Sequence, residues 1–157
     1  MDPEIARSIG MAGAAAAVSC AALGSAMGTG SAAISAVGAW KKCYAQERQA
    51  PFMLTVFIGA PLTQTIYGFI LMNYLMGLVQ ETPSSFAALL GAGIFGGFAM
   101  GFSSWFQGRT GGAASDALAE TGKGFGYYLM SIGIVETVAL FVMVFLMIKV
   151  NPGLLTG

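Results

Sequence analysis

The feature that most constrains this chain is the spacing of its charged residues, which leaves long apolar segments between them. Only Glu136 carries a charge between Lys123 and Lys149, and it has twelve residues on either side. No charge occurs in residues 8–40, 49–80 or 82–108. A helix needs about 20 mainly apolar residues to cross a bilayer, so each segment is long enough. The pattern predicts an all-α membrane protein with four transmembrane helices, at 9–40, 51–79, 84–118 and 124–148.

The composition agrees with a membrane protein and excludes several other classes. Only 9% of the 157 residues are charged, against about 25% in an ordinary soluble domain. The net charge is zero and no basic patch is present, so nucleic-acid binding has no support. The chain has no His, and Cys20 and Cys43 are too isolated for a zinc site or a disulfide framework. We expect a single membrane domain over 1–157 with no cofactor, and two free thiols, one in a helix and one in a loop.

The basic residues indicate how the helices cross the membrane. Five of the seven lie within 41–48 and 109–123, in two loops or in the helix end that leads to the second one, and only Arg7 and Lys149 lie on the other side. The positive-inside rule therefore predicts cytoplasmic loops at 41–50 and 118–123, with both termini outside. In the short outer turn, Thr82-Pro83-Ser84 predicts a helix cap with proline at the first helical position.

The four predicted helices resemble two copies of one hairpin, 9–79 and 84–148. "MGTGSAA" (27–33) resembles "QGRTGGAA" (107–114), and "QTIYGFILM" (64–72) resembles "ETVALFVMV" (136–144). The second match places Gln64 opposite Glu136. We therefore interpret the chain as a duplicated helical hairpin.

Glycines occur four residues apart in the first and third predicted helices. Small residues at this spacing let helix backbones approach closely in lipid. Two interpretations remain open: a tight bundle inside one subunit, or an inner ring of helices from many identical subunits. The segment "GAGIFG" (91–96) fits the dinucleotide fingerprint only in its letters, since no strand precedes it. The glycines concerned are Gly24 and Gly28, and Gly93, Gly97 and Gly101.

Glu136 lies at the centre of a predicted transmembrane helix, where a charged side chain is unfavourable and therefore needs an explanation. A charge at the bilayer centre costs at least about 2.5–3.5 kcal/mol. No Lys or Arg lies at that depth in the sequence, which excludes a structural salt bridge within the chain. Two interpretations remain: a neutral, hydrogen-bonded acid with a structural role, or a group that binds and releases a proton or cation.

Polar residues in two other helices are candidate neighbours of this glutamate. Thr63, Gln64 and Tyr67 in "PLTQTIYG" (61–68) share one helix face. Gln107 lies towards the cytoplasmic end of the third apolar segment, and its depth need not match that of Glu136. Together they form an all-oxygen set of the kind that hard cations prefer, with Tyr67 as a donor to the carboxylate. Taken singly, each is explained as well by ordinary interhelical hydrogen bonding.

Pro61 adds an irregularity to the second helix. It has no backbone N–H, so it frees a carbonyl one turn earlier, near Phe57. Irregular backbone at this point is a further possible source of an oxygen ligand.

The segments "PLTQTIYG", "FQGR" and "GIVETVAL", taken together, resemble the proteolipid (K or c) of the rotor ring of V-type rotary ATPases. The resemblance covers essentially the whole chain. It implies a membrane ring of several copies that rotates against a stator, with one transported ion per four helices, carried by Glu136. It also implies a non-catalytic transport subunit, because ATP is hydrolysed or made on other subunits.

The sodium-translocating members of this family resemble the chain further, because they have a Thr-Gln pair in the second helix and a Gln in the third. The resemblance then implies sodium as the transported ion and Tyr67 as the partner of the carboxylate. The implied ion ligands are Glu136, Gln107, Gln64, Thr63 and the backbone carbonyl of Ala60. A proton-translocating rotor is the alternative within the family, with the two glutamines as hydrogen-bond partners only.

The resemblance also implies partners and a location. We expect identical subunits in a ring, a stator subunit with a basic residue, a central-stalk subunit at the cytoplasmic loops, and membrane lipid, in a prokaryotic plasma membrane. Two alternatives come from other classes. One is a four-helix exporter of small cations, and the other is a purely structural assembly subunit, which would tolerate Glu136→Gln.

Overall fold

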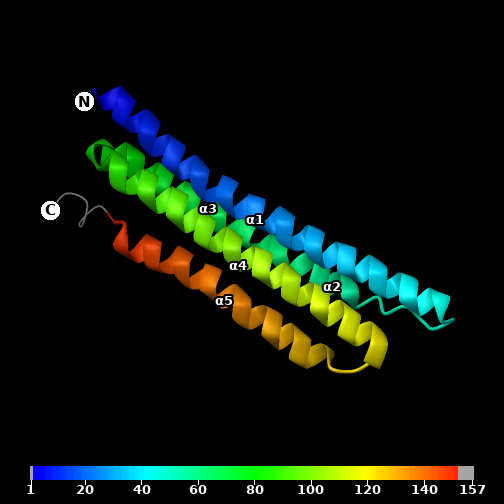
Figure 1. Ribbon diagram of the computed structural model, residues 1–157. Helices are drawn as coiled ribbons and strands as arrows, with labels where there is room; N and C mark the ends of the chain where they lie inside the picture. The colour runs from blue at the N-terminus through cyan, green and yellow to red at the C-terminus, as the bar shows by residue number, and fades with distance from the viewer. Residues whose placement is uncertain (1, 152–157) are drawn as a thin grey trace.

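The computed structural model describes residues 2–151, and these are folded almost entirely as helix (Figure 1). The elements in chain order are α1 (Pro3–Ala45), α2 (Leu54–Gly59), the 3₁₀ turn η1 (Ala60–Leu62), α3 (Thr63–Glu81), the 3₁₀ turn η2 (Pro83–Ser85), α4 (Phe86–Thr121) and α5 (Phe125–Lys149). Four stretches within the described residues are long and apolar enough to cross a membrane: Pro3–Ala45, Leu54–Glu81, Pro83–Thr121 and Phe125–Lys149. The predicted fold class, an all-α protein with four such helices, is confirmed.

Two helices run further than their apolar segments. α1 continues to Ala45, so Cys43 lies in a helix and the prediction that it lies in a loop is wrong. α4 continues to Thr121 and ends where Gly122 adopts a left-handed backbone with φ 67°. The connections are therefore shorter than the predicted loops 41–50 and 118–123, because charged side chains in water do not interrupt the backbone hydrogen bonds of a helix.

The outer turn also differs from its prediction. Pro83 begins the 3₁₀ turn η2 rather than α4 itself. The Thr82 hydroxyl does not cap the next helix but donates back to the carbonyl of Leu78, at 3.0 Å. The threonine therefore closes α3, and the predicted cap on the following helix is wrong.

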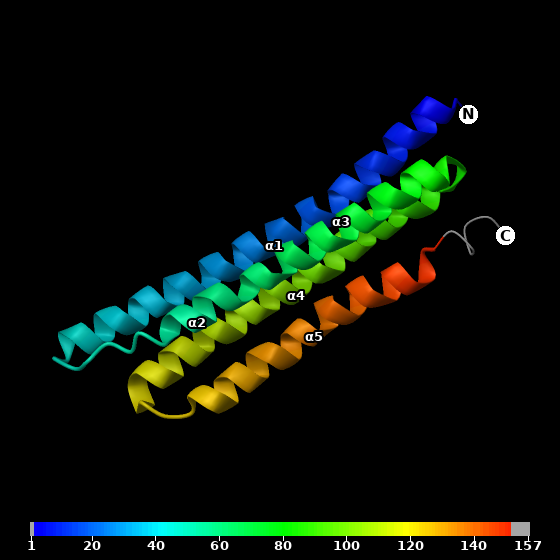
Figure 2. The ribbon, with the colours of Figure 1, turned by 180° about the vertical axis from the view of Figure 1, so that it is seen from behind.

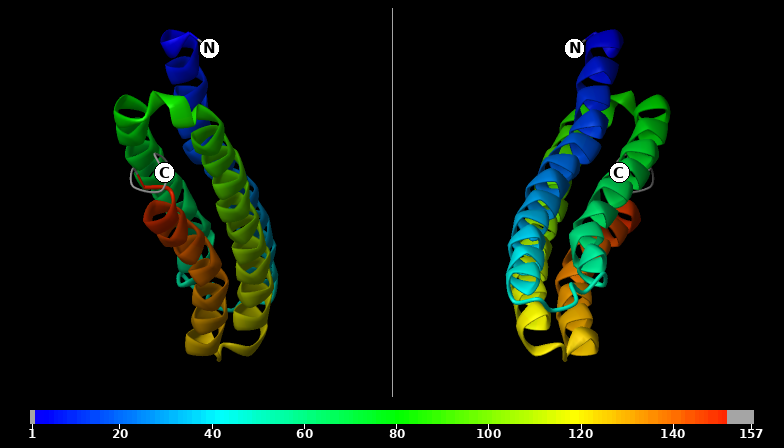
Figure 3. Two further views of the ribbon diagram at one scale, coloured as in Figure 1. Left: turned by 90° about the vertical axis from the view of Figure 1, so that its left-hand side faces the viewer. Right: turned by 90° about the vertical axis from the view of Figure 1, so that its right-hand side faces the viewer.

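The long helices lie side by side and alternate in direction (Figures 1 and 2). The N-terminus, the turn from α3 to α4 and the end of α5 lie at one end of the molecule. The connections from α1 to α2 and from α4 to α5 lie at the other end. The start of α1 lies next to the turn between α3 and α4, where Pro3 and Pro83 line one pocket, and it is drawn above this turn in Figure 3.

Glycines bring α1 and α4 into direct backbone contact. A Cβ atom at Gly24 would collide with the backbone of Gly101, and one at Gly93 would collide with the carbonyl of Gly13. In lipid there is no hydrophobic force to join two helices, so close van der Waals packing of this kind has to hold them. The glycines at these positions thus pack a bundle inside one subunit, which was the first of the two interpretations. We name this contact the α1–α4 seam.

α5 packs less closely against the rest of the molecule than α1 and α4 pack against each other. It is the most hydrophobic of the four candidate spans and the least buried. Its buried residues are Ile132, Ala139 and Met143, which define one narrow stripe of the helix. Large apolar side chains such as Phe141 and Phe145 are exposed. A surface of this composition suits lipid tails or the apolar face of another chain.

Candidate ion-binding site

A belt of polar side chains crosses the molecule between two apolar clusters. One cluster includes Leu71, Met100 and Ala139, and the other includes Phe57 and Ile132. On α5, Glu136 lies between Ile132 and Ala139, and therefore between the two clusters. Similarly, Gln64 follows Phe57 and precedes Leu71 in the second span, and Gln107 follows Met100 in α4. The polar belt is thus enclosed on both sides by apolar packing, at mid-length of the bundle.

The helix break at Pro61 shapes one side of this belt. Ala60–Leu62 form a 3₁₀ turn between α2 and α3, so the backbone is irregular as predicted. The Thr63 hydroxyl lies 3.0 Å from the carbonyl oxygen of Ala60 and 3.2 Å from Oε1 of Gln64. Three oxygens from consecutive parts of the chain are therefore gathered at the break.

The carbonyl of Phe57, which Pro61 leaves without its helical donor, lies elsewhere. It lies close to α4, where a Cβ atom at Gly111 would lie 2.9 Å from its oxygen. The carbonyl of Ala60, in contrast, accepts a hydrogen bond from Thr63, a side chain of the belt. Ala60 is therefore the better candidate for a backbone ligand than Phe57.

The two glutamines connect the break to the glutamate. Both side chains are fully buried. Nε2 of Gln64 donates to Oε1 of Gln107 at 2.8 Å, and Nε2 of Gln107 lies 3.2 Å from Oε2 of Glu136. Gln107 is therefore level with Glu136, which its position in the sequence left open.

Glu136 receives hydrogen bonds on both carboxyl oxygens. The Tyr67 hydroxyl donates to Oε1 at 2.8 Å, and Gln107 donates to Oε2. The structure thus brings Thr63, Gln64, Tyr67, Gln107 and Glu136 into one hydrogen-bonded network. In residues 2–151 both ion pairs involve Lys42, at one end of the bundle, and neither involves Glu136.

This network has the chemistry of a cation site. It presents carboxylate, amide, hydroxyl and carbonyl oxygens, which are the ligands of hard cations. The side chain of Glu136 is only partly buried, whereas both glutamines are inaccessible. The carboxylate therefore forms the open side of the network.

Two residues beside the network were not singled out from the sequence. Ser103 donates to the carbonyl of Val135 at 2.8 Å, and Ser104 donates to the carbonyl of Pro61 at 2.6 Å. Serines are common in tightly packed helices, so their type gave no signal. Their place in "FSSWFQGR" (102–109), one turn before Gln107, is the signal that was available.

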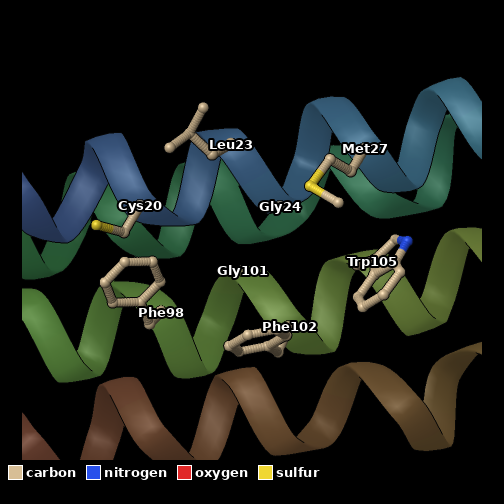
Figure 4. A pocket seen from close by; sticks show the side chains of 8 residues that line it. All are labelled: Cys20, Leu23, Gly24, Met27, Phe98, Gly101, Phe102 and Trp105. Carbon is tan, nitrogen blue, oxygen red and sulfur yellow. The ribbon is translucent and has the colours of Figure 1, made fainter.

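A separate groove lies between α1 and α4, away from this network (Figure 4). Its lining is apolar apart from the Cys20 thiol and the Trp105 indole. It offers no set of oxygen ligands, so we do not regard it as the ion site. The lining residues are Cys20, Leu23, Gly24, Met27, Phe98, Gly101, Phe102 and Trp105.

The second half of the chain is similar to a known family. Residues 90–148 match the family model that describes the C subunit of ATP synthase. This range contains most of α4 and nearly all of α5, and with them Gln107 and Glu136. The comparison with curated proteins gave no significant match. The match covers less than half of the chain, and it shows that the segment with Gln107 and Glu136 is similar to this family.

Proposed function

We propose that this chain is the rotor-ring subunit of a V-type rotary ATPase and carries sodium ions at Glu136. The observation that carries the proposal is the network of Thr63, Gln64, Gln107, Tyr67 and Glu136. The match of residues 90–148 to the C subunit of ATP synthase supports the rotor over a small-cation exporter. The network supports an ion-carrying role over a purely structural one.

Glu136 is the hydrogen-bond acceptor in its contacts with the neighbouring side chains. Both oxygens accept hydrogen bonds, from Tyr67 and from Gln107. A carboxylate is an acceptor only, whereas a protonated acid would need an acceptor for its own hydrogen. Charge at membrane depth has to be compensated, and neither ion pair of the described residues involves this group. The transported cation supplies the compensating charge.

The extra oxygens favour sodium over a proton. A proton needs only the acid and one hydrogen-bond partner, which Tyr67 alone would supply. The network adds a hydroxyl, two amide oxygens and the carbonyl of Ala60 next to the helix break. Such a set is useful to a cation that must exchange its water shell for protein oxygens.

The proposed cycle uses the contrast between the open carboxylate and the buried glutamines. With sodium bound, the site is neutral, so it can move through the bilayer region as the ring turns. At the stator a basic side chain replaces the ion as partner of Glu136, and sodium leaves. The empty site then loads from the other side. A membrane potential contributes about 2.3 kcal/mol per charge per 100 mV to this transfer.

The proposed ring and its orientation in the membrane imply where further copies, lipid and the central stalk contact this chain. Further copies of the chain and lipid would cover the exposed apolar side chains of α4 and α5. The end that holds the connections between α1 and α2 and between α4 and α5 would face the cytoplasm and the central stalk. Lys41, Lys42, Arg48 and Lys123 lie near this end, which agrees with the positive-inside rule. Both termini would then lie outside.

The test is carbodiimide labelling of Glu136 in membranes that contain the assembled complex. Carbodiimides attack protonated carboxyl groups, so a bound cation protects. Sodium is titrated at fixed pH, with potassium at equal ionic strength as the control for salt. A Glu136→Gln variant identifies the labelled site, and should abolish the labelling.

Protection by sodium and not by potassium is the expected result. Labelling that responds to pH and to neither salt would replace sodium by a proton in the proposal. Labelling that depends on none of these would contradict an ion-carrying role for Glu136.

A further inference from the structure

The adjacent serines of α4 make contacts that set them apart from other serines of this chain. Five serines donate to the carbonyl four residues earlier in their own helix, which is the usual bond of a serine inside a helix. Ser103 and Ser104 instead donate to backbone carbonyls of other elements. Those five serines are Ser8, Ser19, Ser35, Ser115 and Ser131.

The acceptors of these two bonds lie next to the residues of the polar network. Ser103 holds the carbonyl of Val135, which immediately precedes Glu136. Ser104 holds the carbonyl of Pro61, inside the 3₁₀ turn that precedes Thr63. The two bonds thus reach the two segments of backbone that carry the network on either side of α4.

Gln107 makes the corresponding side-chain bonds one turn further along α4. Ser103 and Gln107 are four residues apart and both bond to α5, at Val135 and Glu136. Ser104 and Gln107 are three residues apart, and both bond to the second span, at Pro61 and Gln64. Residues three and four apart lie on one helix face. The two serines and Gln107 therefore bond from one face of α4 to the same two neighbouring segments.

Both serine hydroxyls are buried, so their hydrogen bonds are shielded from water. The exposed fraction is 7% for Ser103 and 0% for Ser104, so water does not readily replace either bond. The Ser25 hydroxyl of α1 lies 3.2 Å from that of Ser104 and is itself buried. Because Ser104 has one hydrogen, which it gives to Pro61, Ser25 is the donor in this contact. Three elements, α1, α4 and η1, are joined through the Ser104 hydroxyl.

From this arrangement we infer that Ser103 and Ser104 are positioning residues that set the ion affinity of the site. They fix the carbonyl beside Glu136 and the helix break beside Thr63 at the distances that let Gln107 reach both sides. The inference rests on the proposed function, since the affinity concerned is that of the ion at Glu136.

The test compares serine-to-alanine variants of the assembled complex by the sodium concentration that half protects Glu136 from carbodiimide. Ser103→Ala and Ser104→Ala should each raise this concentration about threefold to tenfold, the usual effect of losing one buried hydrogen bond. Ser115→Ala is the matched control. Ser115 is buried in the same helix, but its hydroxyl bonds only within α4, to Gly111 at 2.9 Å.

Conservative variants separate positioning from packing. Ser103→Thr keeps the hydroxyl and should restore the wild-type concentration. Ser104→Cys keeps the size but donates weakly, and should fall between wild type and Ser104→Ala. Equal amounts of assembled complex in membranes of all variants show that the change is one of affinity. Serine variants that match Ser115→Ala would overturn the inference.

Failure of the inference is distinguishable from failure of the proposed function. If sodium protects the wild type and all variants alike, the function stands and the positioning role is wrong. If sodium does not protect the wild type, the sodium proposal is wrong. The serines are then assessed from the labelling rate of Glu136 without added ion, at one fixed pH. An unchanged rate in Ser103→Ala and Ser104→Ala would overturn the positioning role in that case too.

Discussion

The α1–α4 seam and the contact of α5 with its neighbours are built from opposite kinds of side chain. In the seam, Gly24 meets Gly101 and Gly13 meets Gly93, backbone against backbone. α5 is held along one narrow stripe, where specific hydrogen bonds are added to apolar packing. Ser103 and Gln107 bond to its middle, and the hydroxyl of Tyr74 lies 2.8 Å from the carbonyls of Met147 and Val150 near its end.

We infer from this difference that the α1–α4 seam stabilises the fold, whereas the contacts of α5 serve ion binding. A seam of glycines leaves no side chain to rearrange, so it provides a rigid frame. A helix held by a few specific hydrogen bonds can carry a group whose bonding changes when an ion arrives or leaves. Changes in the seam should therefore act on folding, and changes at the network should act on ion binding. Substitutions in both regions test that separation.

Glu136→Gln should abolish ATP-driven sodium uptake by vesicles that contain the complex, while the chain still assembles. The amide keeps the shape of the side chain but cannot balance the charge of the ion. The control is Glu81→Gln, at an exposed position at the end of α3, which should leave uptake unchanged. Loss of assembly in Glu136→Gln would contradict the separation, because the glutamate would then belong to the frame.

Gly24→Ala should lower the yield and thermal stability of the folded chain in detergent, because its Cβ would collide with the backbone of Gly101. Overpacking of this kind costs about 1–3 kcal/mol, and more where the backbone cannot move. Gly30→Ala in the same helix is the control, since a Cβ there meets no atom within 4 Å. Equal stability of the two variants would show that the seam tolerates a wider helix separation.

Gln107→Ala should weaken sodium protection of Glu136 by roughly 5- to 150-fold, with normal assembly. The buried amide of Gln64 loses its acceptor and Glu136 loses a donor, and an unsatisfied buried group costs about 1–3 kcal/mol. Gln80→Ala, at an exposed position, is the control. Unchanged protection would mean that Gln107 only packs the bundle.

Tyr67→Phe should weaken sodium protection by about 2- to 12-fold, because one hydrogen bond to Glu136 is lost and the rest of the network remains. The effect is smaller than at Gln107 because the position is only partly buried and water can replace the hydroxyl. Tyr127→Phe, on the exposed face of α5, should behave as wild type. A loss as complete as that of Glu136→Gln would make the tyrosine essential rather than supporting.

Lys42→Ala should have no measurable effect on stability or sodium protection. Its ammonium group contacts Glu120 at 2.5 Å and Asp116 at 3.4 Å, and joins the ends of α1 and α4. All three side chains are exposed, and ion pairs in water contribute little. Thermal unfolding in low and high salt checks this. A loss like that of Gly24→Ala would show that the frame depends on its ends as well as on the seam.

The number and type of the helices could be predicted from the sequence because they depend on local properties. Charges are costly in lipid, and a backbone without water must bond to itself, so the gaps between charges become helices. The same argument made Glu136 exceptional without any structure. Thr63, Gln64 and Tyr67 could be grouped because they lie on one turn of one helix.

Other features depend on how the helices pack against one another, which no local pattern in the sequence specifies. The sequence could not place Gln107 level with Glu136, because the depth of a residue depends on how far its helix runs past the membrane. It could not show whether the glycines pack within one chain, since the same spacing serves either contact. Nor could it single out Ser103 and Ser104, because a serine bonds to its own helix unless another element comes near enough. Local chemistry thus determined which residues form helices and which acid requires a partner, whereas the partners were decided by distances between helices.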